Sequence, residues 1–429
     1  MLASHAAPMA PAADPIVLPR RPARIEAATL AAGLSLAVLV GLDGSPGWQA
    51  ARVVAVGLLT SALVAAERSA SPRSRGRIAV VAGVAAVAVA AGFAPHLAKS
   101  GPLPVQVAAA VLAVAGVGLT AGGTVVATRG HRRLRRAGSA AVVVGAVALV
   151  AGLVGPAVAA TNVPRPGIGA RPSSAGLASE DVTLRTSDGV ALAAWYVPSG
   201  NGAAVVLLHG AGSTRSDVLD HAAVLAGAGF GVLMVDARGH GESAGRAMDF
   251  GWYGDDDVAA ATRYLARRPD VRPDRIGVVG MSMGGEEAIG ASGSNTAIRA
   301  VVAEGATART AGDEAWLSDE YGVRGLVQEQ LERGQDLVTD ALTDASVPST
   351  LRHAVASSTG TRYLLVTAGD RPDEGHAADH LADAAPGRVE TWTVEGAGHT
   401  QGLATAGEAW TARVGDFLAD ALLGEAGAR

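Results

Sequence analysis

The chain has 429 residues and no cysteine, which excludes thiolate catalysis, a thiolate zinc site and a disulfide framework. Residues 1–172 contain 16 Lys or Arg against 4 Asp or Glu, so their charge is +12, and the remainder carries −17 of the net −5. The acidic remainder argues against nucleic acid as a partner.

The composition changes once along the chain and divides it into parts. Up to Pro172 the sequence consists almost wholly of Ala, Val, Gly and Leu, and from about Ser179 it has the mixed composition of a soluble domain. We therefore predict four parts: a disordered cytoplasmic N-terminus at residues 1–24, a membrane domain at 25–163, a linker at 164–180 and a soluble domain at 181–425.

The predicted membrane domain contains five apolar segments that approach or reach the roughly 20 residues a spanning helix needs. They cover residues 27–42, 50–66, 78–97, 102–128 and 137–163. The first two are short and flanked by charges, so they either span with snorkelling ends or form a shallower hairpin. Gly118 and Gly122 have the four-residue spacing of closely packed helices. These segments indicate about five transmembrane helices, with membrane lipids as partners.

Arginines lie in alternate connections of this half. They precede the first segment and separate the second from the third and the fourth from the fifth, at positions 20, 21, 24, 68, 73, 75, 77, 129, 132, 133, 135 and 136. By the positive-inside rule, the N-terminus is cytoplasmic and the chain leaves the fifth segment on the outer side. We therefore expect a multi-pass protein of the cell membrane whose second half is extracytoplasmic.

From Val182 onward, short β-rich runs alternate with helical stretches, a pattern typical of a mostly parallel sheet covered by helices. Strands are predicted at residues 191–197, 204–208, 232–235, 275–280, 300–303, 363–367 and 389–394, with helices between them at 217–228, 255–267 and 283–291. The acidic stretch 310–344 has a helical pattern without a strand, which predicts a small helical cap at about 306–350.

The sequence Gly280-Met-Ser-Met-Gly fits the motif G-x-S-x-G and lies between a predicted strand and a predicted helix. Its glycines permit the sharp turn that lifts a serine hydroxyl clear of the sheet, and the following helix N-terminus favours developing negative charge. Ser282 is therefore the predicted nucleophile. The motif also arises by chance in a chain with 56 glycines, so the prediction rests on the strand-turn-helix setting.

A second glycine-rich turn, His209-Gly-Ala-Gly, follows the predicted strand 204–208. Flexible backbone at this place can point an N–H group at a reaction oxyanion. We predict an oxyanion hole formed by the backbone N–H groups of Ala211 and Met283, an arrangement that typically stabilises a transition state by a few kcal/mol. The alternative is a glycine-rich strand exit without chemistry.

His399, after the last predicted strand, is the predicted general base, because it follows the serine in the order nucleophile, acid, base. The histidines of the two earlier motifs precede Ser282. His376 and His380 lie four residues apart, which suits a metal pair, but the glutamate of H-E-x-x-H is missing between them. We expect these two on a solvated helix and predict neither a metal nor an organic cofactor.

The acid that orients His399 should follow the predicted strand 363–367 and hold the imidazole in one tautomer. Asp370, Asp373 and Glu374 all qualify in the loop that follows this strand. We favour Asp373, because a few loop residues usually separate the strand-end glycine from the acid.

Four motifs together resemble the α/β-hydrolase superfamily in order and separation. They are Leu207-Leu-His-Gly-Ala-Gly, Val235-Asp-Ala-Arg-Gly-His-Gly-Glu-Ser, Gly280-Met-Ser-Met-Gly-Gly and Gly396-Ala-Gly-His-Thr, and the likeness covers residues 182–423. Within the superfamily the chain is similar to esterases, dienelactone hydrolases and serine aminopeptidases. The resemblance implies an eight-stranded, mostly parallel sheet, an acyl-enzyme, Ser282 as nucleophile and His399 as base. It implies a structural turn at residues 236–243, and the sequence departs from the family at Pro372, where the commonest spacing has aspartate.

We therefore expect a membrane-anchored serine hydrolase that cleaves a small-molecule or lipid-like ester through Ser282, His399 and Asp373. A peptidase or amidase on the same scaffold is the alternative among enzymes. A non-catalytic membrane receptor or scaffold with a hydrolase-like ligand-binding domain is the alternative of another class. Glu286 and Glu287, on the helix after the nucleophile, are expected to be exposed and favoured by the helix dipole.

Overall fold

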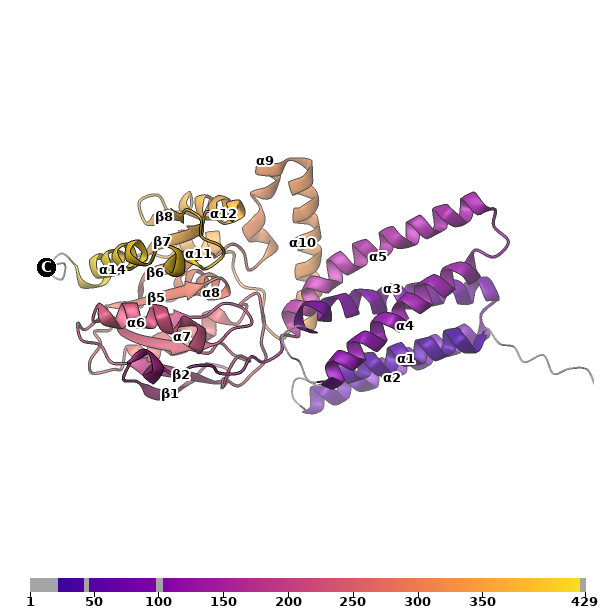
Figure 1. Ribbon diagram of the computed structural model, residues 1–429, viewed down its shortest axis with the longest axis horizontal. Coiled ribbons are helices and arrows are strands. Elements are labelled where there is room, and N and C mark those ends of the chain that lie inside the picture. The colour runs from indigo at the N-terminus through magenta and orange to yellow at the C-terminus, as the bar shows by residue number, and fades with distance from the viewer. Residues whose placement is uncertain (1–21, 42–45, 98–102, 425–429) are drawn as a thin grey trace, which may run out of the picture.

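The computed structural model describes residues 22–41, 46–97 and 103–424 (Figure 1). Residues 1–21 of the predicted disordered N-terminus lie outside these ranges. The described chain forms a bundle of apolar helices followed by a sheet covered by helices on both faces, which we call the sheet domain (Figure 1).

The first five helices form the bundle, and each one coincides with a predicted apolar segment. They are α1 (Pro22–Val40), α2 (Pro46–Ser69), α3 (Pro72–Leu97), α4 (Leu103–Ala127) and α5 (Arg133–Thr161). Among the described residues, α2 to α5 are long and apolar enough to cross a membrane. A crossing by α1 stays a prediction.

Small residues let α3 lie close to α4. A Cβ added at Gly83 would be 2.7 Å from the backbone oxygen of Gly116, so a larger residue there would push the two helices apart. The four-residue spacing of Gly118 and Gly122 does not serve close packing of α4, because their Cβ positions face open space. The stripe of α4 that faces α3 contains Gly116 and Gly123 instead.

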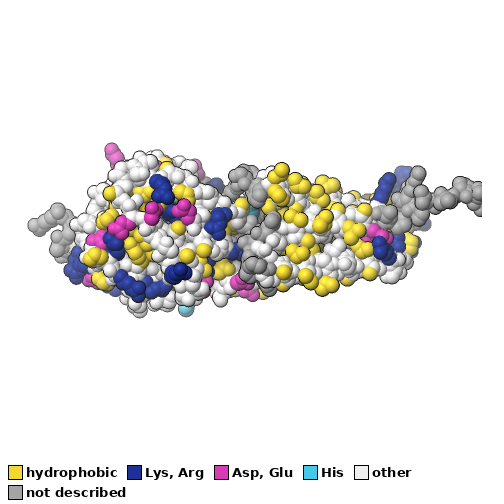
Figure 2. Space-filling view, turned by 90° about the horizontal axis from the view of Figure 1, so that it is seen from below, with side chains coloured by type: hydrophobic (Ala, Val, Ile, Leu, Met, Phe, Trp, Pro, Cys, Tyr) yellow, Lys and Arg dark blue, Asp and Glu magenta, His cyan; other side chains and the backbone are white. Residues whose placement is uncertain are grey.

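Charged side chains are absent from the middle of the bundle on the face shown in Figure 2 and gather at its far end and over the sheet domain. The connections from α2 to α3 and from α4 to α5 lie at the far end, where Arg68 pairs with Glu26 at 3.0 Å. The sheet domain follows α5 at the opposite end (Figure 1). A band of uncharged surface between polar ends suits a bilayer.

The sheet domain contains one eight-stranded sheet in the order β1-β2-β4-β3-β5-β6-β7-β8. Its strands are β1 (Glu180–Arg185), β2 (Ala191–Val197), β3 (Ala204–Leu208), β4 (Gly231–Val235), β5 (Ile276–Met281), β6 (Ile298–Glu304), β7 (Arg362–Ala368) and β8 (Val389–Val394). β2 pairs antiparallel with β1 and β4, and all other neighbours are parallel. The predicted eight-stranded, mostly parallel sheet is confirmed.

Two apolar cores, one on each face, hold the helices against the sheet. On one face lie α7 (Gly254–Leu265), α8 (Met283–Ser292), α11 (Leu351–Ser357) and α12 (Pro372–Ala382). On the other lie α6 (Leu219–Gly227), which follows the short helix η2 (Arg215–Val218), and α14 (Gly407–Leu423), which follows α13 (Gly402–Thr405). The short helix η1 (Pro172–Ala175) precedes β1. Parallel strands covered on both faces explain the almost continuous apolar runs of β3 to β5.

The segment between β6 and α11 forms the short helix η3 (Ala311–Glu314), α9 (Leu317–Tyr321) and α10 (Val323–Leu342), without a strand. It falls within the range predicted for a cap. Figure 1 shows α10 running across the end of α5, where Gln335 Nε2 donates to the backbone oxygen of Gly152 at 2.9 Å.

The carboxyl edge of the parallel strands faces the bundle. In the loop after β4, the N–H of Asp249 donates to the backbone oxygen of Ala160 at 2.9 Å, and Met248 and Trp252 form an apolar cluster with the same alanine. The α9–α10 segment, which follows β6, contacts α5 at the same end. Ligand sites of open α/β sheets lie outside this edge.

Candidate active site

Ser282 lies between β5 and α8 in a backbone conformation that few non-glycine residues adopt. Its φ is 51° and its ψ is −121°, and such a conformation persists only where the surroundings impose it. A Cβ at Gly280 would be 2.1 Å from the backbone oxygen of Gly284, and a Cβ at Gly284 would be 2.7 Å from that of His209. The two motif glycines are therefore required sterically, and the turn presents the serine hydroxyl at the carboxyl edge.

Three side chains from separate segments form a connected series that starts at this hydroxyl. His399 Nε2 lies 2.9 Å from Ser282 Oγ, and its Nδ1 lies 2.7 Å from Glu374 Oε1. The second carboxylate oxygen of Glu374 accepts the N–H of Ala368 at 2.8 Å, so the side chain is fixed at both oxygens. His399 reaches the serine from the loop after β8, close to Gly305, whose Cβ would lie 2.9 Å from the imidazole ring.

The carboxylate on His399 belongs to Glu374 and not to Asp373, the residue favoured from the sequence. Asp373 is exposed, and its Oδ1 accepts the hydroxyl of Tyr321 from the cap at 2.7 Å. Asp370 is also exposed. Glu374 is the only buried member of the three, with 3% of its surface accessible.

Pro372 explains the difference physically. It occupies the first position of α12, where its missing N–H costs nothing and its fixed φ suits a helix. The segment expected as a loop is therefore already helical at Asp373, and the helix turns that side chain outward and Glu374 inward. The longer glutamate side chain then reaches the imidazole from the first turn of α12.

The two ring nitrogens of His399 have distinct roles in this geometry. A carboxylate accepts hydrogen bonds only, so Nδ1 carries the proton and Nε2 faces Ser282 as an acceptor. The hydrogen bond to Glu374 raises the pKa of His399 above its ordinary value against the opposing effect of partial burial. The arrangement supports a base that takes a proton from the serine and is stabilised once charged.

The predicted oxyanion groups lie on the two turns nearest to Ser282. Met283 is the first residue of α8, so its N–H has no acceptor within the helix. Ala211 lies in the turn after β3, next to Gly210, whose Cβ position is 3.4 Å from the Cβ of Ser282. Both N–H groups therefore belong to backbone segments next to Ser282. Their role in binding the oxyanion stays a prediction.

Two buried histidines shape this turn and do not approach the serine. His209 Nδ1 lies 2.8 Å from the Gly210 oxygen, and its Nε2 accepts the N–H of Ala237 at 3.1 Å. His240 Nε2 accepts the N–H of Gly212 at 3.3 Å. Burial lowers the pKa of His209 to about 4 and that of His240 to about 3, so both rings are neutral at pH 7 and fix loop geometry.

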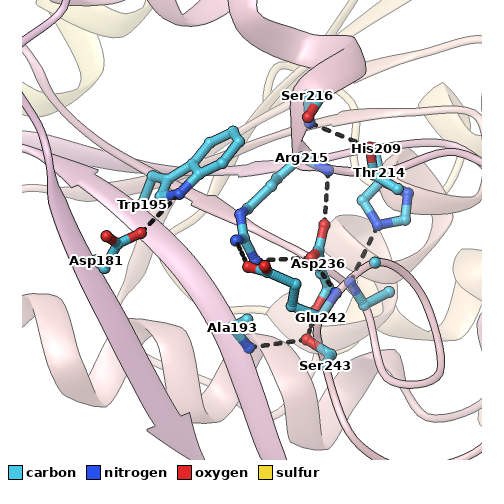
Figure 3. Close-up of polar contacts among 12 residues, drawn as sticks. Asp181, Ala193, Trp195, His209, Thr214, Arg215, Ser216, Asp236, Glu242 and Ser243 are labelled. Carbon is cyan, nitrogen blue, oxygen red and sulfur yellow. Dashed lines mark hydrogen bonds and ion pairs between the residues drawn. The ribbon is translucent and has the colours of Figure 1, made fainter. Parts of the chain in front are cut away.

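The turn at residues 236–243 is held by a buried ion pair (Figure 3). Asp236 accepts Arg215 Nη1 at 2.7 Å and the Arg215 N–H at 2.8 Å, and it also accepts the N–H of Glu242 at 2.9 Å. The Arg215 guanidinium lies 4.2 Å from the centre of the Trp195 ring. This network positions the turn beneath the site, in agreement with the structural role that the resemblance implies.

Glu304, at the end of β6, was not identified from the sequence. Its backbone oxygen accepts the N–H of Ser282 at 2.8 Å. Its carboxylate accepts the N–H of Gly402 at 2.7 Å and Trp410 Nε1 at 2.8 Å. One residue thus connects the nucleophile turn to the segment that follows His399. No sequence motif marks it, because the partners of its carboxylate lie 98 and 106 residues away in the chain.

Glu286 and Glu287 are buried, with 6% and 3% of their surfaces accessible, so the prediction that they are exposed was wrong. Every residue of α8 is buried, because this helix is covered by α7 and α11. Glu286 Oε1 accepts the N–H groups of Thr307 and Ala308, each at 3.2 Å. Burial raises the pKa of Glu286 to about 7 and places that of Glu287 well above its ordinary value.

His376 and His380 lie on α12, as the sequence predicted, but His376 is not simply solvated. Its ring stacks on Trp316 with centres 5.5 Å apart, and its Nε2 lies 3.6 Å from Glu320. In the described ranges, no group of three or more His, Asp or Glu side chains is placed to bind a metal ion.

Comparison with known proteins finds likeness in the sheet domain. A family model described as serine aminopeptidase, S33, matches residues 200–344. An uncharacterized protein of Mycobacterium tuberculosis is 37% identical over 130 residues, which are 29% of this chain and 46% of the relative. The thiohydrolase aneE of Aspergillus aculeatus is 33% identical over 127 residues, 28% of this chain and 40% of that protein. The chain thus matches less than half the length of these curated relatives.

Among solved structures, the esterase Pf2001 of Pyrococcus furiosus is 24% identical. It covers 61% of this chain and 100% of its own, with a TM-score of 0.47. A dienelactone hydrolase from Anabaena variabilis is 17% identical and has a TM-score of 0.41, covering 57% of this chain and 98% of its own.

Proposed function

Because the C-terminal part of the chain is an α/β-hydrolase domain, we propose that the protein is a membrane-anchored serine hydrolase that cleaves carboxylic esters. The observation that carries the proposal is the connected series of Ser282, His399 and Glu374, with contacts of 2.9 Å and 2.7 Å. The strained backbone at Ser282 supports it, because strain of this kind is retained at functional sites.

The proposed reaction has two half-reactions through an acyl-enzyme. His399 Nε2 takes the proton of Ser282 as Oγ attacks the ester carbonyl, and the N–H groups of Ala211 and Met283 stabilise the oxyanion. The imidazolium, held by Glu374, then donates its proton to the leaving alcohol. Water repeats the attack on the acyl-serine with the same base, releasing the acid and restoring the serine.

A fluorophosphonate probe tests the nucleophile directly. We expect the full-length protein in detergent to be labelled and the Ser282→Ala variant to lose labelling entirely. Ser294→Ala, at an exposed serine, is the matched control and should be labelled like the wild type. Labelling that persists in Ser282→Ala would show that another residue is the nucleophile, and folded wild-type protein without labelling would favour the non-catalytic receptor.

A peptidase is the second candidate, because the family model that matches residues 200–344 is described as a serine aminopeptidase. The same three side chains serve ester and amide cleavage, since the scaffold fixes the chemistry of the acyl transfer and not its substrate. Turnover of p-nitrophenyl esters should exceed that of aminoacyl anilides for an esterase. The opposite ranking would identify a peptidase.

We also propose that the bundle spans the cell membrane and places the sheet domain on the extracytoplasmic side. Four helices of sufficient length and apolarity support the spanning. The arginine-rich connections at the end of the bundle away from the sheet domain support the orientation by the positive-inside rule.

A further inference from the structure

Helix α10 is amphipathic, and its polar face is turned toward the sheet domain. Glu329 Oε1 accepts the N–H of Ser318 at 2.8 Å, and Asp336 Oδ2 accepts the N–H of Ala311 at 2.8 Å. Between them on the same face lies Glu332, a member of the group that lines a hollow under α10. These three acidic residues of α10 are thus directed into the cap.

The opposite face of α10 is exposed and mostly apolar, with Gln330 as a polar residue on it. Val323, Leu326, Val327 and Leu337 have 78%, 49%, 54% and 75% of their surfaces exposed. Their spacing places all four on one side of a helix with 3.6 residues per turn. This orientation is the reverse of an ordinary surface helix, which buries its apolar side and exposes its polar side.

The same apolar face continues onto the bundle. Gly334 lies on it, and a Cβ there would be 2.6 Å from Leu153 of α5. At the end of α10, Leu342 packs against the apolar core of the bundle. On α5 itself, Leu149 is 53% exposed. The uncovered side chains of α10 therefore extend an exposed apolar surface that belongs to a membrane-spanning helix.

The position of this contact along α5 indicates how deep α10 lies relative to the bilayer. α5 has 29 residues, about 43 Å at 1.5 Å per residue, whereas the hydrocarbon core of a bilayer is about 30 Å thick and takes about 20 residues. With the arginines at 133, 135 and 136 at one boundary, the hydrocarbon extends from about residue 137 to about residue 157. Gly152 and Leu153, where α10 crosses, fall just inside its second boundary.

We infer that α10 lies in the membrane interface with Val323, Leu326, Val327 and Leu337 inserted among the lipid acyl chains of the leaflet next to the sheet domain. The inference rests on the proposed membrane anchoring. An amphipathic helix that lies in the interface plane buries its apolar face at the boundary between headgroups and acyl chains. The carboxyl edge with Ser282 faces the same leaflet, so the substrates in reach are amphiphilic esters of that leaflet.

The absence of native cysteine makes a site-specific test direct. Leu326→Cys and Leu337→Cys are each labelled with the fluorophore NBD in the full-length protein. The labelled protein is reconstituted into phosphatidylcholine vesicles with or without nitroxide-bearing phosphatidylcholine, which quenches only fluorophores in contact with acyl chains. Val144→Cys, 68% exposed on α5, is the positive control, and Ala412→Cys, exposed on α14, is the negative control.

We expect at least twofold quenching at positions 326, 337 and 144 and none at 412. Quenching at Val144→Cys without quenching at Leu326→Cys and Leu337→Cys would overturn the inference and leave the membrane anchoring intact. No quenching at Val144→Cys would overturn both. Energy transfer between labelled α10 helices without lipid quenching would show that a second copy covers this face, which also overturns the inference. Fluorophosphonate labelling of each variant verifies folding and tests the serine independently.

Discussion

At the residue scale, the acid of the proposed triad depends on one backbone feature. Asp373 and Glu374 are adjacent and chemically alike, yet only Glu374 reaches His399, at 2.7 Å. Pro372 begins α12, and the helix directs successive side chains about 100° apart. A carboxylate directed inward is buried and fixed, whereas its neighbour is free to pair with Tyr321 of the cap.

The pair of neighbours provides a matched test of this assignment. We expect Glu374→Gln to lower kcat for a p-nitrophenyl ester by about 10²- to 10⁴-fold, because the amide no longer stabilises the imidazolium. Since Glu374 raises the pKa of His399, the acidic limb of the kcat/KM profile should also move to lower pH. Asp373→Asn should change kcat less than about threefold. Equal losses in the two variants would disprove the assignment.

The buried carboxyl of Glu286 should make stability depend on pH. Its pKa is raised to about 7, so between about pH 4.5 and 7 the native protein holds a proton that the unfolded chain releases. The stability that this proton contributes is fully present below about pH 4.5 and is lost as the pH rises through about 7. The free energy of unfolding falls by no more than about 1.4 kcal/mol per pH unit over this range.

Melting temperatures in detergent between pH 5 and pH 8 check this expectation. The wild type should lose stability as the pH rises, and Glu286→Gln, which keeps an oxygen for Thr307 and Ala308, should lose less. Glu408→Gln, at an exposed glutamate, should follow the wild type. Parallel curves for the wild type and Glu286→Gln would refute the assignment of the effect to this carboxyl.

At the scale of elements, the turn after β4 depends on the pair of Asp236 and Arg215. Both side chains are almost fully buried, at 0% and 1% accessibility, so removing Asp236 leaves the buried Arg215 charge with the half-exposed Glu242 as its partner. We expect Asp236→Ala to lower the free energy of unfolding by about 3 to 5 kcal/mol. Asp420→Ala, at an exposed pair with Arg362, should cost less than about 1 kcal/mol.

Urea unfolding in detergent, followed by tryptophan fluorescence, measures this difference. Trp195 lies against the Arg215 guanidinium and reports on the turn directly. A loss of stability in Asp236→Ala no larger than in Asp420→Ala would show that the network is not needed for the fold.

The elements that the sequence predicted are those with a strong local pattern. The apolar run of β3 is observed at the predicted residues, and α8 begins at the predicted residue after the nucleophile. β1 was missed because it is an edge strand that is mostly exposed and has no apolar run. The burial of Glu286 was missed because it depends on which helices cover α8, and that is a property of tertiary packing.

The site residues that could be predicted from the sequence are those whose position depends on the residues next to them in the chain. Ser282 and His399 lie in glycine-rich turns that a sequence displays. Glu374 depends on where α12 begins, and Glu304 acts through partners that only the folded chain brings near. The structure was needed to choose Glu374 among the three carboxylates that the sequence allowed, and to identify Glu304.

At the scale of the whole molecule, the bundle gives the sheet domain a definite orientation. The carboxyl edge of the sheet faces the bundle, and Asp249 and α10 contact α5 there. The linker adds a further attachment, because the Arg165 guanidinium donates to the backbone oxygens of Gly245 and Gly241 at 3.2 Å and 3.4 Å. The two halves are therefore joined at several points and not by a free tether.

The orientation of the whole chain in the membrane is tested by reporter fusions after Thr161. We expect an alkaline phosphatase fusion to be active and a green fluorescent protein fusion to be dark, because both report an extracytoplasmic position. Fusions after Arg132, in an arginine-rich connection, should show the opposite pattern. A dark, inactive phosphatase fusion with a bright fluorescent fusion at Thr161 would reverse the proposed topology.

The attachment by Arg165 has a kinetic consequence. With the bundle in the bilayer, as proposed above, a site held close to it by a short, fixed linker encounters substrate in a plane and not in a volume. Its rate of encounter is then set by the mole fraction of substrate in the leaflet and by lateral diffusion. Diluting the substrate with inert lipid should slow turnover even when its amount per volume of suspension is unchanged.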